Sequence, residues 1–358
     1  MSRSTLAITA AVALSIGATD FMSHSASAQT QAFPPPGKTL MMQLGTTSGS
    51  GTDAAGILIA KYLKKYLPGQ PSIALQHMPG AGGMTALNHV VLRTEPDGML
   101  IIMGSASVLD PYNTRKANAK YDPTKFRIIG GIGRGGSALI ISEDAEKRLL
   151  NKSGPPAIMG TSGPIPRQGM QAVMWGAEYL DWNVKWVTGY PGTNDLMVAL
   201  DRGEIDMTTT GNIFMFADRI KSGKVKIISQ AGMVKDGKSI GREDYGNAPL
   251  ITERLEGKIE DPLAKKALNY WVAMNTADKW FALAPGTPDY IVEIYRKAWD
   301  KIVVDPQFLA EGERISDAFF PVGHKEVQEY IQTLADTPDE AIEFTLSLLR
   351  KQGINVPK

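Results

Sequence analysis

The stretch from Thr39 to Met103 decides the fold, and it reads TLMMQLGTTSGSGTDAAGILIAKYLKKYLPGQPSIALQHMPGAGGMTALNHVVLRTEPDGMLIIM. Its apolar spacing predicts three strands and two helices, with the strands at residues 39–44, 72–76 and 100–103 and the helices at 53–67 and 84–93. This alternation predicts a parallel sheet covered by helices, because parallel neighbours need a crossover connection.

The same alternation starts again in the second half of the chain. Further strands are predicted at residues 127–132, 137–142, 157–160, 184–187, 206–210 and 224–229. Further helices are predicted at residues 167–180, 193–202, 215–222, 290–303, 325–334 and 340–351. Residues 233–278 are less periodic and richer in charge, so we interpret them as an insertion. The predicted fold class is α/β, with a parallel-rich sheet in each of two units.

The composition of the chain argues against several classes of function. The chain has 358 residues, a net charge of +1 and no cysteine. Its length suggests about two domains, and the near-neutral charge argues against a nucleic-acid partner, which requires clustered Lys and Arg. The absence of cysteine excludes disulfides, thiol nucleophiles and thiolate zinc sites. Because His77, His89 and His324 stand apart from other candidate ligands, we expect no metal site.

The first residues are typical of a secretory signal peptide. Arg3 is followed by an apolar stretch from Leu6 to Ala18, and Ala26-Ser27-Ala28 fits a small-residue cleavage site. We expect cleavage after residue 28 and a mature chain that begins at Gln29. A membrane anchor is the alternative, but the apolar run is shorter than the roughly 20 residues that span a bilayer. The expected location is the periplasm.

Motifs for catalysis and for cofactors are missing or incomplete. The chain has no G-x-S-x-G and no G-x-x-x-x-G-K-[ST] sequence. Gly49, Gly51 and Ala54 fit G-x-G-x-x-A, but no acidic residue lies between Asp53 and Glu95 to bind a ribose. We therefore expect no cofactor and no catalysis.

Loops rich in glycine and hydroxyl side chains suggest anion binding instead. Six of them follow predicted strands, at residues 45–52, 79–83, 104–107, 160–163, 190–194 and 208–212. In a parallel sheet such loops share the carboxyl edge, where open α/β sheets bind ligands. Backbone N–H groups at helix starts, together with Ser and Thr hydroxyls, would form a cradle for a carboxylate.

Several of these stretches resemble one family. The loop Gly49–Asp53, the segment Gln76–Gly83 with Pro96-Asp97-Gly98 downstream, and Ala199–Asp206 are similar to motifs of the extracytoplasmic solute receptors of tripartite tricarboxylate transporters, also called Bug proteins. The similarity runs from about Thr39 to Leu334. Residues 161–170 depart from the family's usual glycine-serine-x-x-histidine-leucine helix start.

The resemblance implies a two-lobed, type II periplasmic-binding-protein fold of clamshell form. Lobe 1 would comprise residues 39–134 and 250–358, and lobe 2 would comprise residues 135–249. A small organic carboxylate would bind between the lobes, and the receptor would deliver it to a membrane permease. We expect a monomer, because a clamshell needs free lobes. Two alternatives stay open: a ligand-sensing module for a membrane sensor, and an enzyme on the same scaffold with Asp53 or Asp195 as general base.

The resemblance also suggests which residues contact the ligand. Carried over by position, they are Thr46, Thr47, Ser48, Thr52, Asp53, Ala81, Gly82, Gly83, Thr161, Ser162, Gly163, Tyr190, Thr193, Asn194, Thr210 and Asn212. The glycine and hydroxyl loop at residues 104–107 adds Ser105. From its own chemistry we add Arg167, whose guanidinium could bind a second carboxylate, or could be a solvated surface charge. Whether the ligand is aromatic stays open, since Trp175, Trp182 and Trp186 could stack on a ring or belong to the core.

Overall fold

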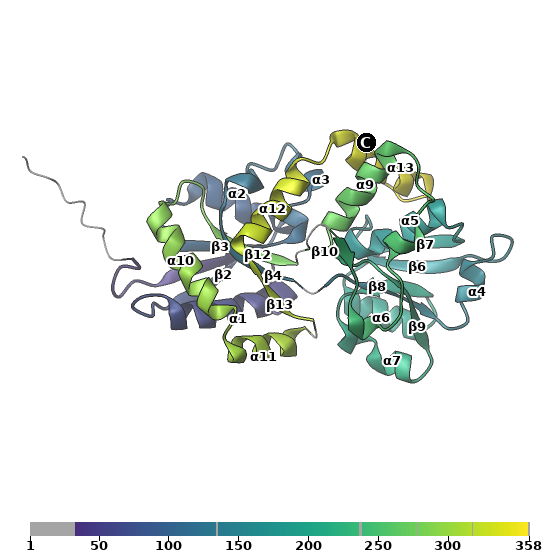
Figure 1. Cartoon of the computed structure of the whole chain (residues 1–358), viewed down its shortest axis with the longest axis horizontal. Coiled ribbons are helices and arrows are strands. Elements are labelled where there is room, and N and C mark those ends of the chain that lie inside the picture. Colours follow the sequence, from purple (N-terminus) through teal and green to yellow (C-terminus); the bar gives the residue numbers. More distant parts are fainter. Residues whose placement is uncertain (1–32, 134, 236–237, 277, 317, 357–358) are drawn as a thin grey trace, which may run out of the picture. The chain divides into compact units, whose positions relative to one another are not determined.

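The computed structural model describes residues 33–133, 135–235, 238–276, 278–316 and 318–356. The signal peptide predicted at residues 1–28 lies outside them. Within the described residues the chain is α/β, with two larger mixed sheets and one short hairpin, which confirms the predicted class (Figure 1). Among the helices of this described part, none has both the length and the apolar character to cross a membrane.

The first sheet has six strands in the order β13-β4-β12-β3-β1-β2. The strands are β1 (Leu40–Leu44), β2 (Ile73–His77), β3 (Leu100–Ser105), β4 (Arg127–Gly133), β12 (Lys279–Leu283) and β13 (Phe320–Gly323). As the alternation predicts, β1 pairs in parallel with both β2 and β3. The strand β12 was not predicted, and it lies antiparallel between β3 and β4.

The longer helices beside this sheet include α1 (Gly51–Tyr66), α2 (Met84–Arg93), α10 (Asp289–Ile302), α11 (Pro306–Ile315) and α12 (His324–Ala335). Helix α1 begins where Ser50 caps it, since the Ser50 Oγ accepts a hydrogen bond of 3.1 Å from the Asp53 N–H. On the sheet, Leu40, Met42 and Leu44 are fully buried against this helix layer. Apolar burial therefore holds the strand that leads into the first glycine loop.

The second sheet has five strands in the order β7-β6-β8-β5-β9. They are β5 (Ala138–Ser142), β6 (Ala157–Ser162), β7 (Val184–Tyr190), β8 (Met207–Thr210) and β9 (Val225–Gln230). Strand β6 pairs in parallel with β7 and β8, whereas β5 is antiparallel to β8 and β9. The associated helices are α4 (Glu146–Leu149), α5 (Ala172–Tyr179), α6 (Thr193–Asp201) and α7 (Ala217–Lys221).

The segment interpreted as an insertion, residues 233–278, contains regular structure. Strands β10 (Met233–Lys235) and β11 (Lys238–Ile240) form an antiparallel hairpin, and helices α8 (Ile251–Arg254) and α9 (Pro262–Ala273) follow. The Asp261 carboxylate caps α9 by accepting hydrogen bonds from the Leu263 and Ala264 N–H groups. Helix α9 packs against α13 (Asp339–Lys351), near the short helix α3 (Pro111–Thr114) in Figure 1.

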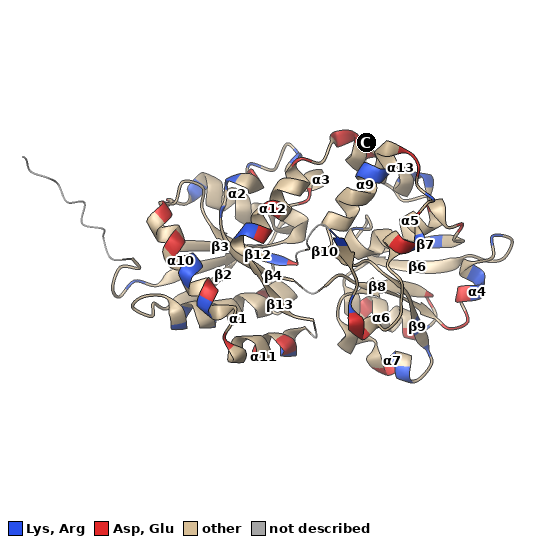
Figure 2. Cartoon of the chain, viewed as in Figure 1, with Lys and Arg blue, Asp and Glu red and all other residues tan. Residues whose placement is uncertain are grey.

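Charge is spread over the described fold. Figure 2 shows Lys and Arg interspersed with Asp and Glu on the helices that surround both sheets. Many of these charges are paired at the surface, for example Lys61 with Glu311 and Arg219 with Asp201. This mixed distribution differs from the clustered cations that bind nucleic-acid phosphates.

Candidate ligand-binding site

The three loops that follow β1, β2 and β3 meet at one edge of the first sheet, because these strands run parallel. A small cavity of about 10 Å³ lies where they meet. Among its lining residues are five that the sequence analysis selected: Thr46, Thr52, Gly82, Gly83 and Ser105. A cavity of this size has room for about one water molecule. The structure therefore brings these residues together, with the loops packed closely on one another.

Glycine makes this close packing possible. A Cβ placed on Gly45 would lie 2.7 Å from the Gly83 Cα, so the two loop backbones touch directly. Gly82 and Gly83 have φ angles of +67° and +101°, in the region that favours glycine, while Ala81 has a φ of +47°. Thr47, Ser48 and Ala81, also predicted as ligand contacts, lie exposed at the outer side of these loops.

Asp53 holds this loop cluster in place. Its Oδ2 accepts hydrogen bonds from the Gly49 N–H at 2.7 Å and the Ser48 hydroxyl at 3.2 Å, and its Oδ1 lies 2.7 Å from His77 Nε2. The hydrogen bond from Gly49, followed by that from His77, holds the pKa of Asp53 below its usual value. The buried carboxylate thus ties the first glycine loop to the end of β2.

His77 stands apart from other candidate ligands in the sequence, and its pairing with Asp53 was not predicted. The two residues are 24 positions apart, with a helix between them. The signal that indicates the pair is the β1-α1-β2 order itself, which brings the first turn of α1 beside the end of β2.

At the second sheet, the loops after β6 and β7 are joined by backbone hydrogen bonds. The Gly163 N–H donates to the Tyr190 carbonyl at 3.1 Å, and the Gly189 N–H donates to the Gly163 carbonyl at 2.7 Å. Thr161 is fully buried, and its hydroxyl has no hydrogen-bond partner among the described residues. Ser162 is half-buried beside it. The structure thus places three of the predicted residues of this half, Ser162, Gly163 and Tyr190, at one joined pair of loops.

The remaining predicted residues of this half follow β7 and β8. The Thr210 hydroxyl accepts from the Asn212 N–H at 3.3 Å, and the Asn212 side chain accepts from the Phe214 N–H at 3.0 Å, which caps the next turn. Thr193 and Asn194 begin α6, where Asn194 is exposed. Because β6, β7 and β8 run parallel, these loops share one edge of the second sheet.

Arg167 is paired inside the protein. Its guanidinium forms an ion pair with Asp110, a fully buried carboxylate, and lies 4.6 Å from the centre of the Tyr112 ring. It also donates to the Tyr270 hydroxyl at 3.3 Å. The interpretation of Arg167 as a solvated surface charge is therefore wrong. The carboxylate that the structure shows beside it belongs to the chain, and contact with a ligand carboxylate stays a prediction.

The predicted helix 167–180 also begins differently. Residues Gln168–Gln171 form a 3-10 turn, and α5 starts at Ala172. Gln168 has a φ of +49°, which interrupts a regular helix at its start.

Farther along, Trp175 and Trp182 are buried in the core, and Trp186 donates a hydrogen bond of 3.2 Å to the Gln352 side chain. These three tryptophans therefore serve packing in this structure.

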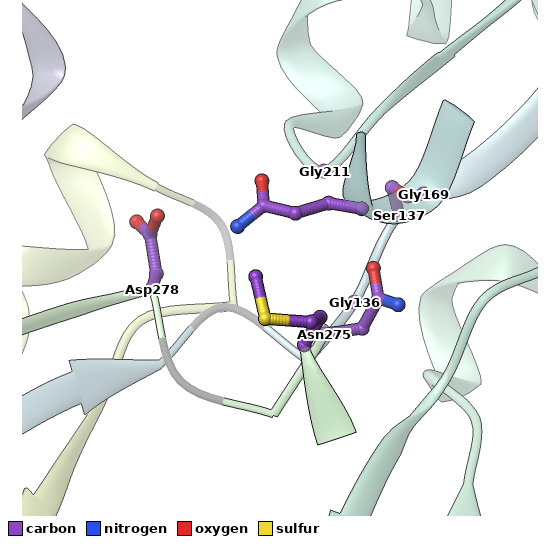
Figure 3. A pocket seen from close by; sticks show the side chains of 8 residues that line it. Gly136, Ser137, Gly169, Gly211, Asn275 and Asp278 are labelled. Atoms are coloured by element: carbon purple, nitrogen blue, oxygen red, sulfur yellow. The ribbon is translucent and has the colours of Figure 1, made fainter. Parts of the chain in front are cut away.

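A second, larger cavity lies beyond the residues that the sequence analysis selected (Figure 3). It measures about 110 Å³ and is lined by Gly136, Ser137, Gln168, Gly169, Gly211, Met274, Asn275 and Asp278. Only Gly211 belongs to a loop identified from the sequence. The lining comes from four separate segments of the chain, so no single motif could reveal it.

Among the described residues, no group of three or more His, Asp or Glu side chains is placed to hold a metal ion.

Comparison with known proteins relates this geometry to solved structures. No protein-family model and no curated protein sequence matches the chain. A TctC solute binding protein from Polaromonas, solved without ligand, matches with a TM-score of 0.63 and 18% identity, over 89% of this chain and 100% of that one. Periplasmic binding protein BugD matches with a TM-score of 0.57 and 19% identity, over 89% and 99%.

A third match, the Rhodopseudomonas palustris protein Rpa4515 with adipate, has a TM-score of 0.59 and 18% identity, over 89% of this chain and 98% of that one. At these identities the comparison establishes the fold. Residues 33–356, as far as the structure describes them, thus adopt the fold of the TctC and BugD solute-binding proteins.

Proposed function

We propose that the protein is a periplasmic solute-binding receptor that captures a small organic carboxylate and delivers it to a membrane permease. The observation that carries this proposal is the convergence of three glycine- and hydroxyl-rich loops at the carboxyl edge of β1, β2 and β3. A protein of the same fold, Rpa4515, was solved with adipate, and another, MatC from Rhodopseudomonas palustris, with malate.

The loop chemistry supports an anion as ligand. Helices α1 and α2 both begin at this edge, and their first N–H groups carry the positive end of the helix dipole. The hydroxyls of Thr46, Thr52 and Ser105 add donors. Gly82 has open space around the position of a Cβ, so a ligand can approach its backbone closely.

The same contacts favour binding over catalysis. Asp53, the first candidate for a general base, already accepts two hydrogen bonds and pairs with His77, and its lowered pKa makes it a weak base. Asp195, the second candidate, is exposed at the first turn of α6. A sensing module would use the same site, and only the membrane partner would differ.

Ligand-induced stabilisation tests the proposal. In a thermal-shift screen of mono-, di- and tricarboxylates, a ligand at 100 times its Kd should stabilise the protein by about 2.7 kcal/mol. Mass spectrometry of the recovered ligand should show it unchanged. A chemically altered ligand would favour the enzyme, and no shift with any carboxylate would contradict the proposal.

Two glycines provide a matched pair for locating the site. Gly82 has a φ of +67° and Gly69 a φ of +70°, and neither has an atom within 4 Å of an added Cβ. Gly82→Gln and Gly69→Gln therefore carry similar backbone strain, but only Gly82 lies at the loop cluster. We expect the first to abolish the ligand-induced shift and the second to keep it.

The proposal extends to location and assembly. The lobes at residues 39–134 with 250–358 and at 135–249 are supported by the sheets, since the first draws its strands from 40–133 and 279–323 and the second from 138–230. N-terminal sequencing of the exported protein should begin at Gln29. Light scattering should give a monomer, and co-purification with a membrane permease, rather than a sensor, would identify the partner.

A further inference from the structure

A cavity of about 390 Å³ lies between α3 and α13 and is lined by residues 111–116 and 339–346. We call it the α3–α13 groove, and none of the predicted ligand contacts is among its lining residues. Its volume is within the roughly 300–1,000 Å³ of small-molecule sites. We propose that this groove binds an apolar monoanion, a molecule with one negatively charged group on a hydrocarbon chain. It is a second site, separate from the glycine loops.

Apolar side chains form the floor of the groove. Pro111 begins α3, and Ile342 and Leu346 lie one turn apart on α13. Because residues four positions apart share one face of a helix, the side chains of Ile342 and Leu346 form a continuous hydrocarbon surface. The ring of Tyr112 packs against the same hydrophobic cluster. A hydrocarbon chain that lies on this floor would be removed from water, which favours its binding.

Arg115 ties the two helices together at one end of the groove. Its guanidinium forms an ion pair with Asp339, in the first turn of α13. It also donates hydrogen bonds of 2.9 Å and 2.6 Å to the carbonyls of Ala335 and Thr337. These contacts hold α13 beside α3, so the groove is formed before a ligand binds. They also engage Arg115 with the chain itself.

Lys116 is the cation that remains for a ligand, because no carboxylate of the described residues pairs with it. Its Nζ donates a hydrogen bond of 3.1 Å to the Asn113 side chain and lies 3.9 Å from the centre of the Tyr112 ring. The lysine is half-buried, and burial lowers its pKa. Lys226, also half-buried, instead pairs with Glu146, which raises its pKa. An ammonium has three donors, so Lys116 can also bind an anion.

The acidic side chains of the groove limit the ligand to one negative charge. Asp339 and Glu343 lie on the α13 side. They pair with Arg115 and Arg350, respectively. A second anionic group on the ligand would face these carboxylates, whose cations are already engaged, and would be disfavoured. An uncharged ligand would leave Lys116 without a counter-ion. The groove thus favours a different class of ligand from the di- and tricarboxylates considered for the glycine loops.

Methyl NMR of the mature protein measures occupancy of the groove. With labelled isoleucine methyl groups, Ile342 reports on the floor, and Ile57, exposed on α1, is the reference. Ile342→Val removes the groove signal and so identifies it. The probes are octanoate, 1-octanol of the same chain length, suberate with a second carboxylate, and the shorter butyrate. We expect octanoate to shift the Ile342 signal and leave that of Ile57, with an affinity at least about tenfold above that of each other probe.

Three variants connect this preference to Lys116. Lys116→Met removes the charge and keeps the apolar stem, so octanoate should bind at least about tenfold more weakly, whereas 1-octanol should bind no more weakly than before. Lys116→Arg keeps the charge and should retain the affinity for octanoate within about threefold. Lys120→Met is the control, since Lys120 is exposed and donates to the Ala117 carbonyl, and it should change neither affinity. Circular dichroism verifies that each variant is folded.

Four results would overturn the proposal. If octanoate does not shift the Ile342 signal, the groove is not a ligand site. If butyrate binds as tightly as octanoate, the apolar floor does not bind the chain. If 1-octanol or suberate matches octanoate, charge does not select the ligand. If folded Lys116→Met keeps the preference for octanoate over 1-octanol, another group binds the anion. All four concern the groove alone, so the receptor function is tested separately.

Discussion

Arg167 and Asp110 form an ion pair that connects the loop after β6 to the start of α3. Asp110 is fully buried, and it also caps α3 by accepting a hydrogen bond of 3.0 Å from the Tyr112 N–H. Lys116 also lies 3.9 Å from the centre of the Tyr112 ring, and burial lowers the pKa of this lysine. Two cations, one aromatic ring and one carboxylate thus share a single cluster.

Removing one partner of this ion pair should lower the free energy of unfolding substantially. Asp110→Ala leaves the guanidinium of Arg167 without its carboxylate, and we expect the free energy of unfolding to fall by about 3–5 kcal/mol. Urea denaturation measures the change. Glu204→Ala is the control, because Glu204 pairs with Arg202 at 3.6 Å on the exposed surface and should contribute no more than about 1 kcal/mol. Equal effects of the two variants would contradict this account.

Replacing Asp53 should lower the free energy of unfolding far more than replacing Asp195, an aspartate in the first turn of another helix. Asp53→Ala leaves the Gly49 N–H and His77 without their acceptor, so we expect a loss of about 1–3 kcal/mol. Asp195 occupies the first turn of α6 as Asp53 does that of α1, but it is exposed. Asp195→Ala should therefore change the unfolding free energy by less than about 0.5 kcal/mol.

The contact between glycine loops gives a steric prediction. Gly45→Ala would place a Cβ 2.7 Å from the Gly83 Cα, and the backbones would have to separate. We expect a loss of about 1–3 kcal/mol in thermal denaturation, together with weaker carboxylate binding. Gly51→Ala is the control: its Cβ would meet nothing within 4 Å at the start of α1, and alanine favours the helix. A harmless Gly45→Ala would show that the loops are not packed as described.

Acid should weaken the attachment of α11 to α1. The Lys65 ammonium, 2.7 Å away, is the main cause that lowers the pKa of Asp305 from 3.8 to about 2. Because the folded protein holds this pKa down, the stabilisation is complete above pH 3.8 and is lost as pH falls toward 2. Asp305→Asn should therefore lower the melting temperature at pH 7 and have a smaller effect near pH 2. A difference that is constant with pH would contradict the prediction.

Local sequence signals predicted much of the fold. Helix α2 spans Met84–Arg93 as expected, and the predicted strands of both parallel runs are present within a few residues of their expected ends. These elements were accessible because apolar periodicity, glycine loops and Pro-Gly turns act over short distances. The parallel pairing of β1 with β2 and β3 followed from the order of the elements.

Among the elements that the sequence analysis missed, helices α9 and α11 and strand β12 were missed for different reasons. Helices α9 and α11 each begin with an Asp-Pro pair, Asp261-Pro262 and Asp305-Pro306, a signal for a helix start that was present but not used. Strand β12 is different. Its five residues, Lys279–Leu283, are all buried, so they lack the alternation that identifies a strand.

The sequence also predicted the proximity of some residues of the candidate site and not of others. Parallel strands predict that Thr46, Gly82 and Ser105 meet, and they line one cavity. The pairing of Arg167 with Asp110 could not be predicted, because it depends on how distant loops pack. Ser137 follows a glycine-rich stretch at residues 131–136 that leads into a strand, and Asp278 comes from a segment without such a pattern, so nothing in the sequence indicated that they lie together.

The position of β12 governs when the first sheet can be completed during synthesis. The strands of the second sheet come from one continuous stretch of chain, from Ala138 to Gln230. In the first sheet, β12 lies between β3 and β4, but it is synthesised only when the chain reaches residues 279–283. As the chain emerges from the ribosome, β4 is therefore made well before β12, because the whole second sheet lies between them in the sequence. Until β12 is made, the facing edges of β3 and β4 have no neighbour, and a chaperone that covers unpaired strands would find them there.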